Sequence, residues 1–308
     1  MFRAFLYDYI RYRKYSYYYP RESNDLPNLN AMIFREAHGL EKGLSLPEVR
    51  LGYGTERINK IISLMIKYDA QGGRTDDLAI QKARSVLGAY IRFHDEKKYD
   101  IGERREELLR WADMQCGIGG YFKTTRGELE EMASGDFAEC ALSRCSVRDY
   151  SAEKVPRGLI CEAVDIARKT PSVCNRQPWH LYIVDDDVVK GELVKLQDGG
   201  GGFGDKAAFL AIVTTDLKSF IGWGERNEAF VDGGLFAMSL LYAFHYKKLG
   251  ACPLNWMVTP EKDRRVRELI RIKPSENIIM IISAGKISEK VRIAKSVRKS
   301  VSDQLTFL

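Results

Sequence analysis

Two short polar motifs in the second half of the chain carry residue types that suit a flat, phosphorylated ligand. In the first, residues 144–150 (RCSVRDY), Arg144 and Arg148 stand four residues apart with Ser146 between them. Arginine presents a planar fork of N–H donors that matches phosphate oxygens, and a serine hydroxyl adds a neutral donor. The motif predicts an anion-binding site, with solvated arginines at the end of a surface helix as the alternative.

The second motif, residues 170–179 (TPSVCNRQPW), is a polar loop bracketed by two prolines. Each proline fixes its own backbone φ angle, so we expect the loop to be rigid. Ser172, Asn175 and Gln177 supply donors and acceptors, and amide side chains can pair with the edge of a flat heterocycle. The alternative is a capped connection whose polar groups bond only to the backbone.

At this spacing, with a helix predicted between them, the two motifs resemble those of the nitroreductase family. Its members carry an R-x-S-x-R-x-aromatic segment followed by a P-S-x-x-N-x-Q-P-W loop, and residues 144–150 and 171–179 match both. The resemblance covers about residues 137–301. It implies an α+β sandwich with a mixed central sheet flanked by helices, and a homodimer with FMN in two sites at the subunit interface.

The resemblance also implies which residues contact the cofactor. Arg144, Ser146 and Arg148 would hold the ribityl phosphate and the pyrimidine side of the flavin. The second motif would lie against FMN, in part from the partner subunit, through Pro171, Ser172, Asn175 and Gln177.

Two later segments complete the implied cofactor site. A loop at residues 250–255 (GACPLN) would pass over the isoalloxazine near N5, with Pro253 and Leu254 as its contacts. Beyond the last strand, Lys295 and Arg298 would approach the phosphate.

The implied activity is that of an FMN-dependent oxidoreductase. NAD(P)H would reduce the flavin, leave, and be replaced by an unidentified small organic acceptor, in a ping-pong cycle of hydride transfer. One alternative is an FMN- and oxygen-dependent dehydrogenase of a bound substrate. The other is a flavin-binding interaction protein of a polysaccharide assembly system.

The elements around the motifs follow from the spacing of apolar residues. Short apolar runs rich in β-forming residues predict strands at 179–184, 206–215 and 277–284. Helices are expected at 156–169, where Pro156 occupies the first turn, and at 229–249. The glycine-rich segment 199–204 precedes a strand instead of joining a strand to a helix. It therefore predicts a flexible loop beside the site and not a dinucleotide-binding turn.

Residues 1–135 fall outside the resemblance and are predicted to form an all-helical extension, with the flavin domain at 136–308. Apolar residues recur at intervals of three and four in 58–66 and 78–91, and Gly72-Gly73 separates the two predicted helices. The H-x-L-E-K-G-L segment at 38–44 is similar to extensions of nitroreductase-like proteins in bacterial polysaccharide gene clusters. We expect His38 to act as a proton donor, with a helix of paired surface charges as the alternative.

Composition excludes several other classes of function. Lys plus Arg number 48 against 42 Asp plus Glu, a net charge of +6 that suits anionic ligands but is too mild to indicate nucleic acid. Six cysteines without a CxxC pair indicate reduced thiols in the cytoplasm, and four scattered histidines give no metal-ligand spacing. No apolar run approaches the roughly 18 residues of a membrane span. The tyrosine-rich segment 1–20 is expected to contact a membrane surface, a partner or the protein itself.

Overall fold

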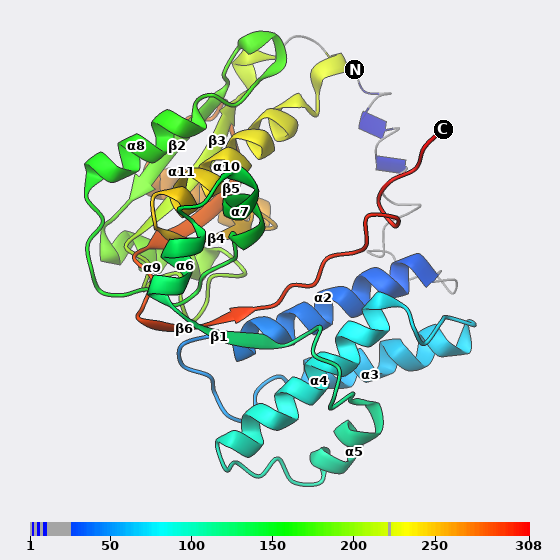
Figure 1. Cartoon of the computed structure of the whole chain (residues 1–308). Helices are drawn as coiled ribbons and strands as arrows, with labels where there is room; N and C mark the ends of the chain where they lie inside the picture. The colour runs from blue at the N-terminus through cyan, green and yellow to red at the C-terminus, as the bar shows by residue number, and fades with distance from the viewer. Residues whose placement is uncertain (1, 3–4, 7–8, 11–25, 221–222) are drawn as a thin grey trace. The chain divides into compact units, whose positions relative to one another are not determined.

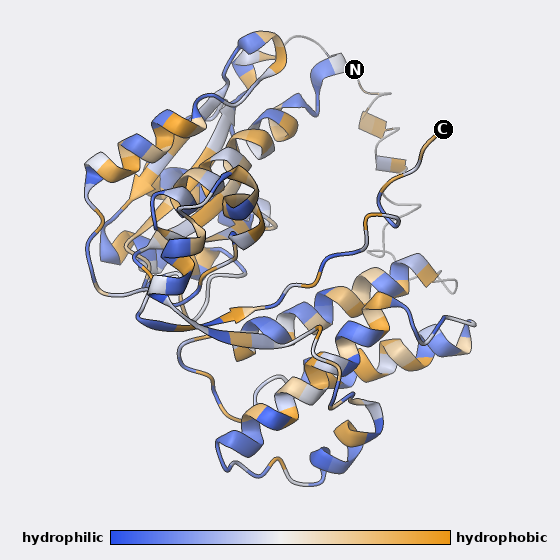
Figure 2. Cartoon of the chain, in the orientation of Figure 1, coloured by the Kyte–Doolittle hydropathy of each residue, from blue (hydrophilic) through white to orange (hydrophobic). Residues whose placement is uncertain are grey.

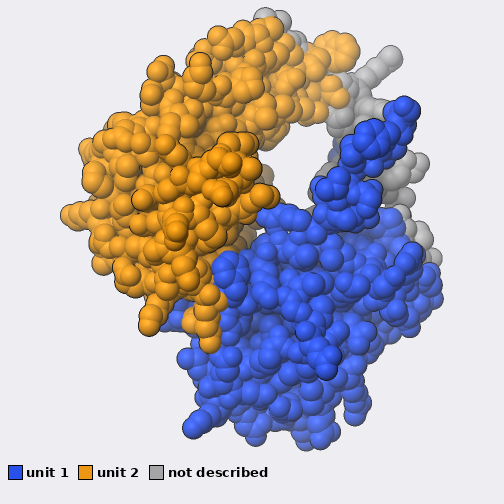
Figure 3. All heavy atoms as spheres, in the orientation of Figure 1, with its two compact units in different colours: residues 1–122, 294–308 blue, residues 123–293 orange. Residues whose placement is uncertain are grey.

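The chain is described by a computed structural model that covers residues 2, 5–6, 9–10, 26–220 and 223–308 (Figure 1). It divides into two compact units, one of residues 1–122 and 294–308 and one of residues 123–293 (Figure 3). We call them unit 1 and unit 2. Most of the tyrosine-rich segment 1–20 lies outside the described residues. The division into folding domains at 1–135 and 136–308 stays a prediction.

Unit 1 is built from helices that share one apolar core. They are α2 (Leu26–Leu44), α3 (Thr55–Ala70), α4 (Leu78–Glu96) and α5 (Arg104–Trp111). Apolar residues spaced three and four apart place one stripe of each long helix inside, as with Ile33, Leu40 and Leu44 on α2. Figure 2 shows this alternation as orange bands along otherwise blue helices. The two helices predicted at 58–66 and 78–91 are confirmed.

The long helices of unit 1 are joined by tight connections. Gly72 sits in the left-handed region (φ 76°) in the turn after α3, which agrees with the break predicted there. Asp77 then caps α4 by accepting a hydrogen bond from the Ala79 amide at 2.9 Å. The same carboxylate accepts from Asn30 on α2 and from the Tyr68 hydroxyl on α3, so one side chain ties three helices together.

Unit 2 is organised around a four-stranded sheet in the order β2-β3-β5-β4, in which every neighbouring pair is antiparallel. The strands are β2 (Trp179–Val184), β3 (Phe209–Asp216), β4 (Gly250–Asn255) and β5 (Glu276–Gly285). The helices are α6 (Arg126–Met132), α7 (Phe137–Ser143), α8 (Arg157–Ala167), α9 (Asp187–Leu196), α10 (Glu228–Tyr246) and α11 (Pro260–Ile270).

The core of unit 2 lies between the sheet and the pair α8 and α10. Phe209, Ala211 and Val213 of β3 face this core, and Leu210 and Ile212, which alternate with them, are buried as well. The central strand is therefore covered on both faces. Gly233 of α10 allows close packing, because a Cβ atom there would lie 2.5 Å from the Ile279 side chain.

The predicted α+β architecture is confirmed, as are the strands expected at 179–184, 206–215 and 277–284. Three strands were missed, including β6 (Lys290–Ala294). Residues 250–255 form the edge strand β4 where a loop was expected, and β1 (Tyr121–Thr125) lies in a region predicted to be all-helical. β1 pairs with β6 in a separate two-stranded sheet. No helix among the described residues is both long enough and apolar enough to cross a bilayer.

Candidate functional site

The first motif runs along the edge of the central sheet. Arg144 is the C-cap residue of α7, and the chain then makes a parallel bridge between Ser146 and Ala251 of β4. The Val147 amide donates to the Ala251 carbonyl at 3.0 Å. Tyr150 anchors the end of the motif, because its buried hydroxyl lies within hydrogen-bond distance of Val147 and Ser283. The motif is thus held by backbone pairing, which leaves its arginine side chains available for a ligand.

Arg148 is a buried cation with no ion pair to any of the described residues. Its residue is 6% exposed, and its guanidinium lies 5.8 Å from the ring centre of Phe203, which belongs to the glycine-rich loop at 199–204. Nη1 makes a long hydrogen bond of 3.3 Å to the Ser146 carbonyl. Nε is buried and has no hydrogen-bond partner within the described residues. A buried donor left unpaired costs about 1–3 kcal/mol, so this geometry favours a site that an anion completes.

The surroundings of Arg144 keep the site positive. Its side chain makes no hydrogen bond or ion pair in the part of the chain that the structure describes. Burial, and then the charge of Arg144, lower the pKa of His245 on α10 to about 4, so this histidine is neutral near pH 7. His245 Nε2 lies 3.0 Å from the Ser143 hydroxyl. Burial raises the pKa of the Cys145 thiol to about 11, so no thiolate offsets the two arginines.

The second motif follows α8 and adopts a strained turn. Cys174, Asn175 and Gln177 all have φ near +50°, in the left-handed region that residues other than glycine rarely adopt. Such conformations cost on the order of 1–3 kcal/mol each and persist only where the surroundings impose them. The Gln177 amide donates to the Ser172 hydroxyl at 2.9 Å. The Ser172 hydroxyl therefore bonds to the loop's own backbone, while the Gln177 side chain bonds to both the carbonyl and the side chain of Asn175.

Two clamps outside the motif impose the strain. The Val173 amide donates to both carboxylate oxygens of Asp232, a residue of α10 that is 2% exposed. Arg176 forms a two-pronged ion pair with Glu225 at 2.8 and 3.1 Å. Sequence reasoning missed Asp232 and Glu225. For Asp232 a signal existed, since it is a carboxylate that interrupts the apolar residues of a long helix.

The two motifs lie at opposite ends of α10 (Figure 1). The second motif contacts Asp232 near the helix N-terminus, whereas the residue before the first motif contacts His245 near the C-terminus. These contacts are thirteen positions apart, which corresponds to about 20 Å at roughly 1.5 Å per residue. Within one chain, Pro171, Asn175 and Gln177 are exposed, at the end of α10 opposite the first motif.

Comparison with known proteins agrees with both motifs. The model of the nitroreductase family matches residues 141–198, which include the two. Over 104 residues the chain is 31% identical to an NADH dehydrogenase of Thermus thermophilus, covering 30% of this chain and 50% of that protein. Over 216 residues it is 24% identical to a 4-nitrobenzoate reductase of Nocardioides sp., covering 54% and 87%.

Solved structures show the same fold. A Parabacteroides distasonis protein assigned as an NADH dehydrogenase/NAD(P)H nitroreductase aligns with a TM-score of 0.50 at 21% identity, over 56% of this chain and 98% of its own. The chain contains a nitroreductase-like domain. A Staphylococcus epidermidis protein assigned as an NAD(P)H:FMN oxidoreductase aligns equally well, with a TM-score of 0.50 at 20% identity, covering 56% and 96%.

Other predicted cofactor contacts fall on different elements of the chain. In the nitroreductase-like domain, Pro253 is exposed and Leu254 is buried, both on β4. Beside them, Gln197 donates to the Asn255 carbonyl at 2.8 Å, while its buried Oε1 has no partner among the described residues. Gln197 is a further polar group that sequence reasoning missed.

Lys295 and Arg298 belong to unit 1 and not to the nitroreductase-like domain of unit 2. Lys295 donates to the Gly117 carbonyl, and Arg298 donates to the carbonyl of Ser296. Both residues are exposed. Their role as phosphate ligands stays a prediction.

His38 lies on α2 of unit 1, where it borders a buried ion pair. Its Nδ1 is 3.5 Å from the carboxylate of Glu41, which is fully buried and 3.1 Å from Lys82 Nζ. Burial alone would raise the pKa of Glu41, but the hydrogen bond with His38 and the charge of Lys82 outweigh it and lower the pKa. The His38 side chain is 44% exposed, and its role as proton donor stays a prediction.

Proposed function

We propose that this protein is an FMN-dependent oxidoreductase that uses NAD(P)H to reduce a small organic acceptor in a ping-pong cycle. The observation that carries the proposal is the buried guanidinium of Arg148 with its unpaired Nε. FMN, when bound, supplies hydride transfer between the nicotinamide and the acceptor. The names of the Thermus, Nocardioides and Staphylococcus proteins support this donor, this cofactor and this class of reaction.

The protein's own residues bind and orient the cofactor and need not react covalently. Arg144, Ser146 and Arg148 would hold the phosphate and the pyrimidine side through charge-assisted hydrogen bonds. The clamped loop would present Ser172 and Asn175 in a fixed geometry, because Asp232 has already set the backbone conformation. The six free cysteines support action in the cytoplasm.

An exposed apolar stripe supports a homodimer built on α10. Val231, Leu235 and Tyr246 are 52%, 45% and 53% exposed, and their positions fall within about 60° on the helix. Phe137 and Leu142 of neighbouring α7 are 76% and 87% exposed. Apolar surface gathered over two helices is typical of an interface with another chain.

A two-fold dimer through this stripe would also complete the cofactor site. If two copies of α10 pair antiparallel, the C-terminal end of one helix lies beside the N-terminal end of the other. The first motif of each subunit then faces the second motif of its partner. We therefore propose that each FMN is held by the arginines of one subunit and by the loop around Asn175 of the other.

Spectroscopy of the purified protein tests the proposed function. We expect a yellow protein that releases FMN, not FAD, on denaturation, and whose flavin is bleached anaerobically by NADH or NADPH. A protein that cannot be loaded with FMN would contradict the proposal. Flavin that is bound but bleached only by an organic substrate would indicate a dehydrogenase, and flavin bleached by neither would indicate an interaction protein.

We further propose His38 as a proton donor in the reductase reaction. The buried carboxylate of Glu41 lies 3.5 Å from Nδ1, which would orient the ring. His38→Ala should then lower turnover and shift the pH profile of turnover without changing the unfolding temperature. His38→Gln should restore the orientation of the side chain but not proton donation, so its turnover should stay low. Unchanged turnover in both variants would remove His38 from the mechanism.

A further inference from the structure

Unit 1 contains a small cleft between α3, α4 and α5 with both apolar walls and positive charge. Its volume is about 220 Å³. The apolar part of its lining consists of Met65, Tyr68, Ile80 and Trp111. Three arginines, Arg74, Arg84 and Arg110, also line it, against a single carboxylate, Asp69. Apolar and aromatic walls with a few convergent polar groups are typical of small-molecule sites.

Two of these arginines differ from the third in their pairing. The side chains of Arg84 and Arg110 make no hydrogen bond or ion pair within the described residues, and the buried Nε of Arg84 is unsatisfied. Arg74 differs, because its guanidinium donates two hydrogen bonds to the Asp76 carboxylate, at 2.6 and 2.8 Å. The nearby carboxylate of Asp113 accepts hydrogen bonds from the amides of residues 115 and 116. The charge of Arg84 helps to lower the pKa of Asp113, after those two hydrogen bonds. The guanidinium groups of Arg84 and Arg110 nevertheless keep donors that no hydrogen bond or ion pair of the described residues occupies.

The walls of the cleft are fixed before any ligand binds. The Tyr68 hydroxyl donates to Asp77 at 3.1 Å, and the Gly73 amide donates to the Tyr68 carbonyl at 3.0 Å. A Cβ atom at Gly73 would lie 2.2 Å from the Tyr68 ring, so only glycine lets this turn close over the aromatic wall. On the other side, the Asp113 amide donates to the Arg84 carbonyl at 3.0 Å. Such preorganisation lowers the entropic cost of binding.

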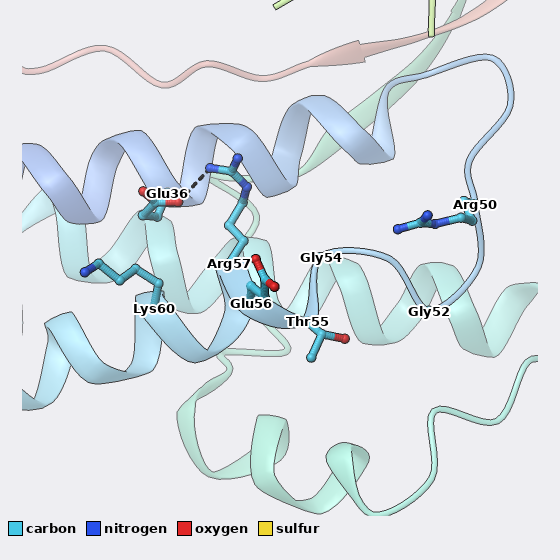
Figure 4. Close-up of a pocket in the computed structure, with 8 residues that line it drawn as sticks. All are labelled: Glu36, Arg50, Gly52, Gly54, Thr55, Glu56, Arg57 and Lys60. Atoms are coloured by element: carbon cyan, nitrogen blue, oxygen red, sulfur yellow. Dashed lines mark hydrogen bonds and ion pairs between the residues drawn. The ribbon is translucent and has the colours of Figure 1, made fainter. Parts of the chain in front are cut away.

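A larger hollow of about 720 Å³ at the start of α3 is a weaker candidate (Figure 4). Its lining mixes Arg50, Arg57 and Lys60 with Glu36 and Glu56. Arg57 is held by Glu36 at 2.6 Å, so much of this charge is already paired. In the smaller cleft, by contrast, Arg84 and Arg110 have no ion pair within the described residues.

We propose that the cleft of α3, α4 and α5 is a binding site for a small aromatic carboxylate. The carboxylate would bridge the guanidinium groups of Arg84 and Arg110, and the ring would lie against Trp111 and Tyr68. Pockets for drug-sized ligands measure roughly 300–1,000 Å³, so this volume fits a compound of a single ring. The site gives the helical unit a binding function that does not depend on the flavin site.

Ligand-observed NMR and calorimetry on the full-length protein test the proposal, with benzoate as the probe and benzyl alcohol as its neutral counterpart. We expect benzoate to bind more tightly than benzyl alcohol. Arg84→Met and Arg110→Met should each weaken benzoate binding about tenfold or more, the loss of one charge-assisted hydrogen bond. Because Arg110 is exposed, its variant remains informative if Arg84→Met fails to fold.

The matched control is Arg105→Met, on α5 but outside the cleft, where Arg105 pairs with Asp95 at 2.9 Å. It should leave benzoate affinity unchanged. Saturating FMN should not displace benzoate, and Arg148→Met should not weaken it, which separates this site from the proposed flavin site. Equal binding of benzoate and benzyl alcohol, equal losses in the Arg110 and Arg105 variants, or displacement by FMN would each overturn the proposal.

Discussion

Arg148→Met should have opposite effects on stability and on cofactor binding. In the protein without ligand, Arg148 is an almost fully buried cation with no ion pair among the described residues and an unsatisfied Nε. Replacing such a group by an apolar side chain of similar length is often neutral or stabilising. We therefore expect the unfolding temperature of the FMN-free variant to equal or exceed that of the wild-type protein.

FMN affinity should change in the other direction. The variant loses at least one charge-assisted hydrogen bond to the phosphate or pyrimidine, which contributes about 1.5–3 kcal/mol. At 1.4 kcal/mol per factor of ten, the dissociation constant should rise by roughly tenfold to 150-fold. Quenching of flavin fluorescence measures the affinity, and circular dichroism of the FMN-free protein measures the unfolding temperature.

The control is Arg265→Met on α11, where Arg265 is 67% exposed and 3.8 Å from Glu268. Both quantities should stay near their wild-type values, since exposed ion pairs contribute little. If Arg148→Met lowers the unfolding temperature and leaves FMN affinity intact, Arg148 is a structural residue and the reasoning is refuted.

Three further changes probe the fold and the interface. The pKa of His245 is about 4 in the folded protein and 6.5 ordinarily. As the pH falls, this histidine is therefore protonated in the unfolded chain before it is protonated in the folded protein. Stability is therefore lost between about pH 6.5 and 4, by up to about 1.4 kcal/mol per pH unit, and His245→Gln should flatten this part of the stability profile. Gly233→Ala should lower the free energy of unfolding by about 1–3 kcal/mol, because the new Cβ atom would clash with the sheet. Gly191→Ala, in open space on α9, should not destabilise the protein. Equal melting temperatures for the two variants would contradict the packing of α10 on the sheet. Leu235→Glu should dissociate the dimer in sedimentation and release FMN, while Val188→Glu, 77% exposed on α9, should do neither.

Local sequence patterns were sufficient to predict the strands and helices in which apolar residues recur regularly. The apolar runs of β2, β3 and β5 are long and bounded by polar residues, and the long helices repeat apolar residues every three or four positions. β4 escaped prediction because Gly250 and Pro253 are typical of loops. Proline is tolerated there because β4 is the edge strand of the four-stranded sheet, and its bridge to the first motif is at Ala251 and not at Pro253.

The candidate site could be predicted in its residue types but not in its arrangement. Nothing in the spacing of residues 144–150 and 170–179 indicates that they pack at opposite ends of α10. The clamps of Asp232 and Glu225 on the second motif likewise join residues about 50–60 positions apart in the chain. Contacts of this kind depend on tertiary packing, which a local pattern does not record.

Mixing two defective variants tests most directly whether the cofactor site is shared between subunits. Arg148→Met breaks the first motif and Asn175→Ala the second, and each alone should bind FMN poorly. In a mixed two-fold dimer, one site would carry both defects and the other would be intact. Random assortment from equal amounts should therefore restore about a quarter of wild-type FMN sites and of NAD(P)H oxidation. If mixing restores neither, although sedimentation shows that mixed dimers form, each site lies within a single chain and the account is wrong.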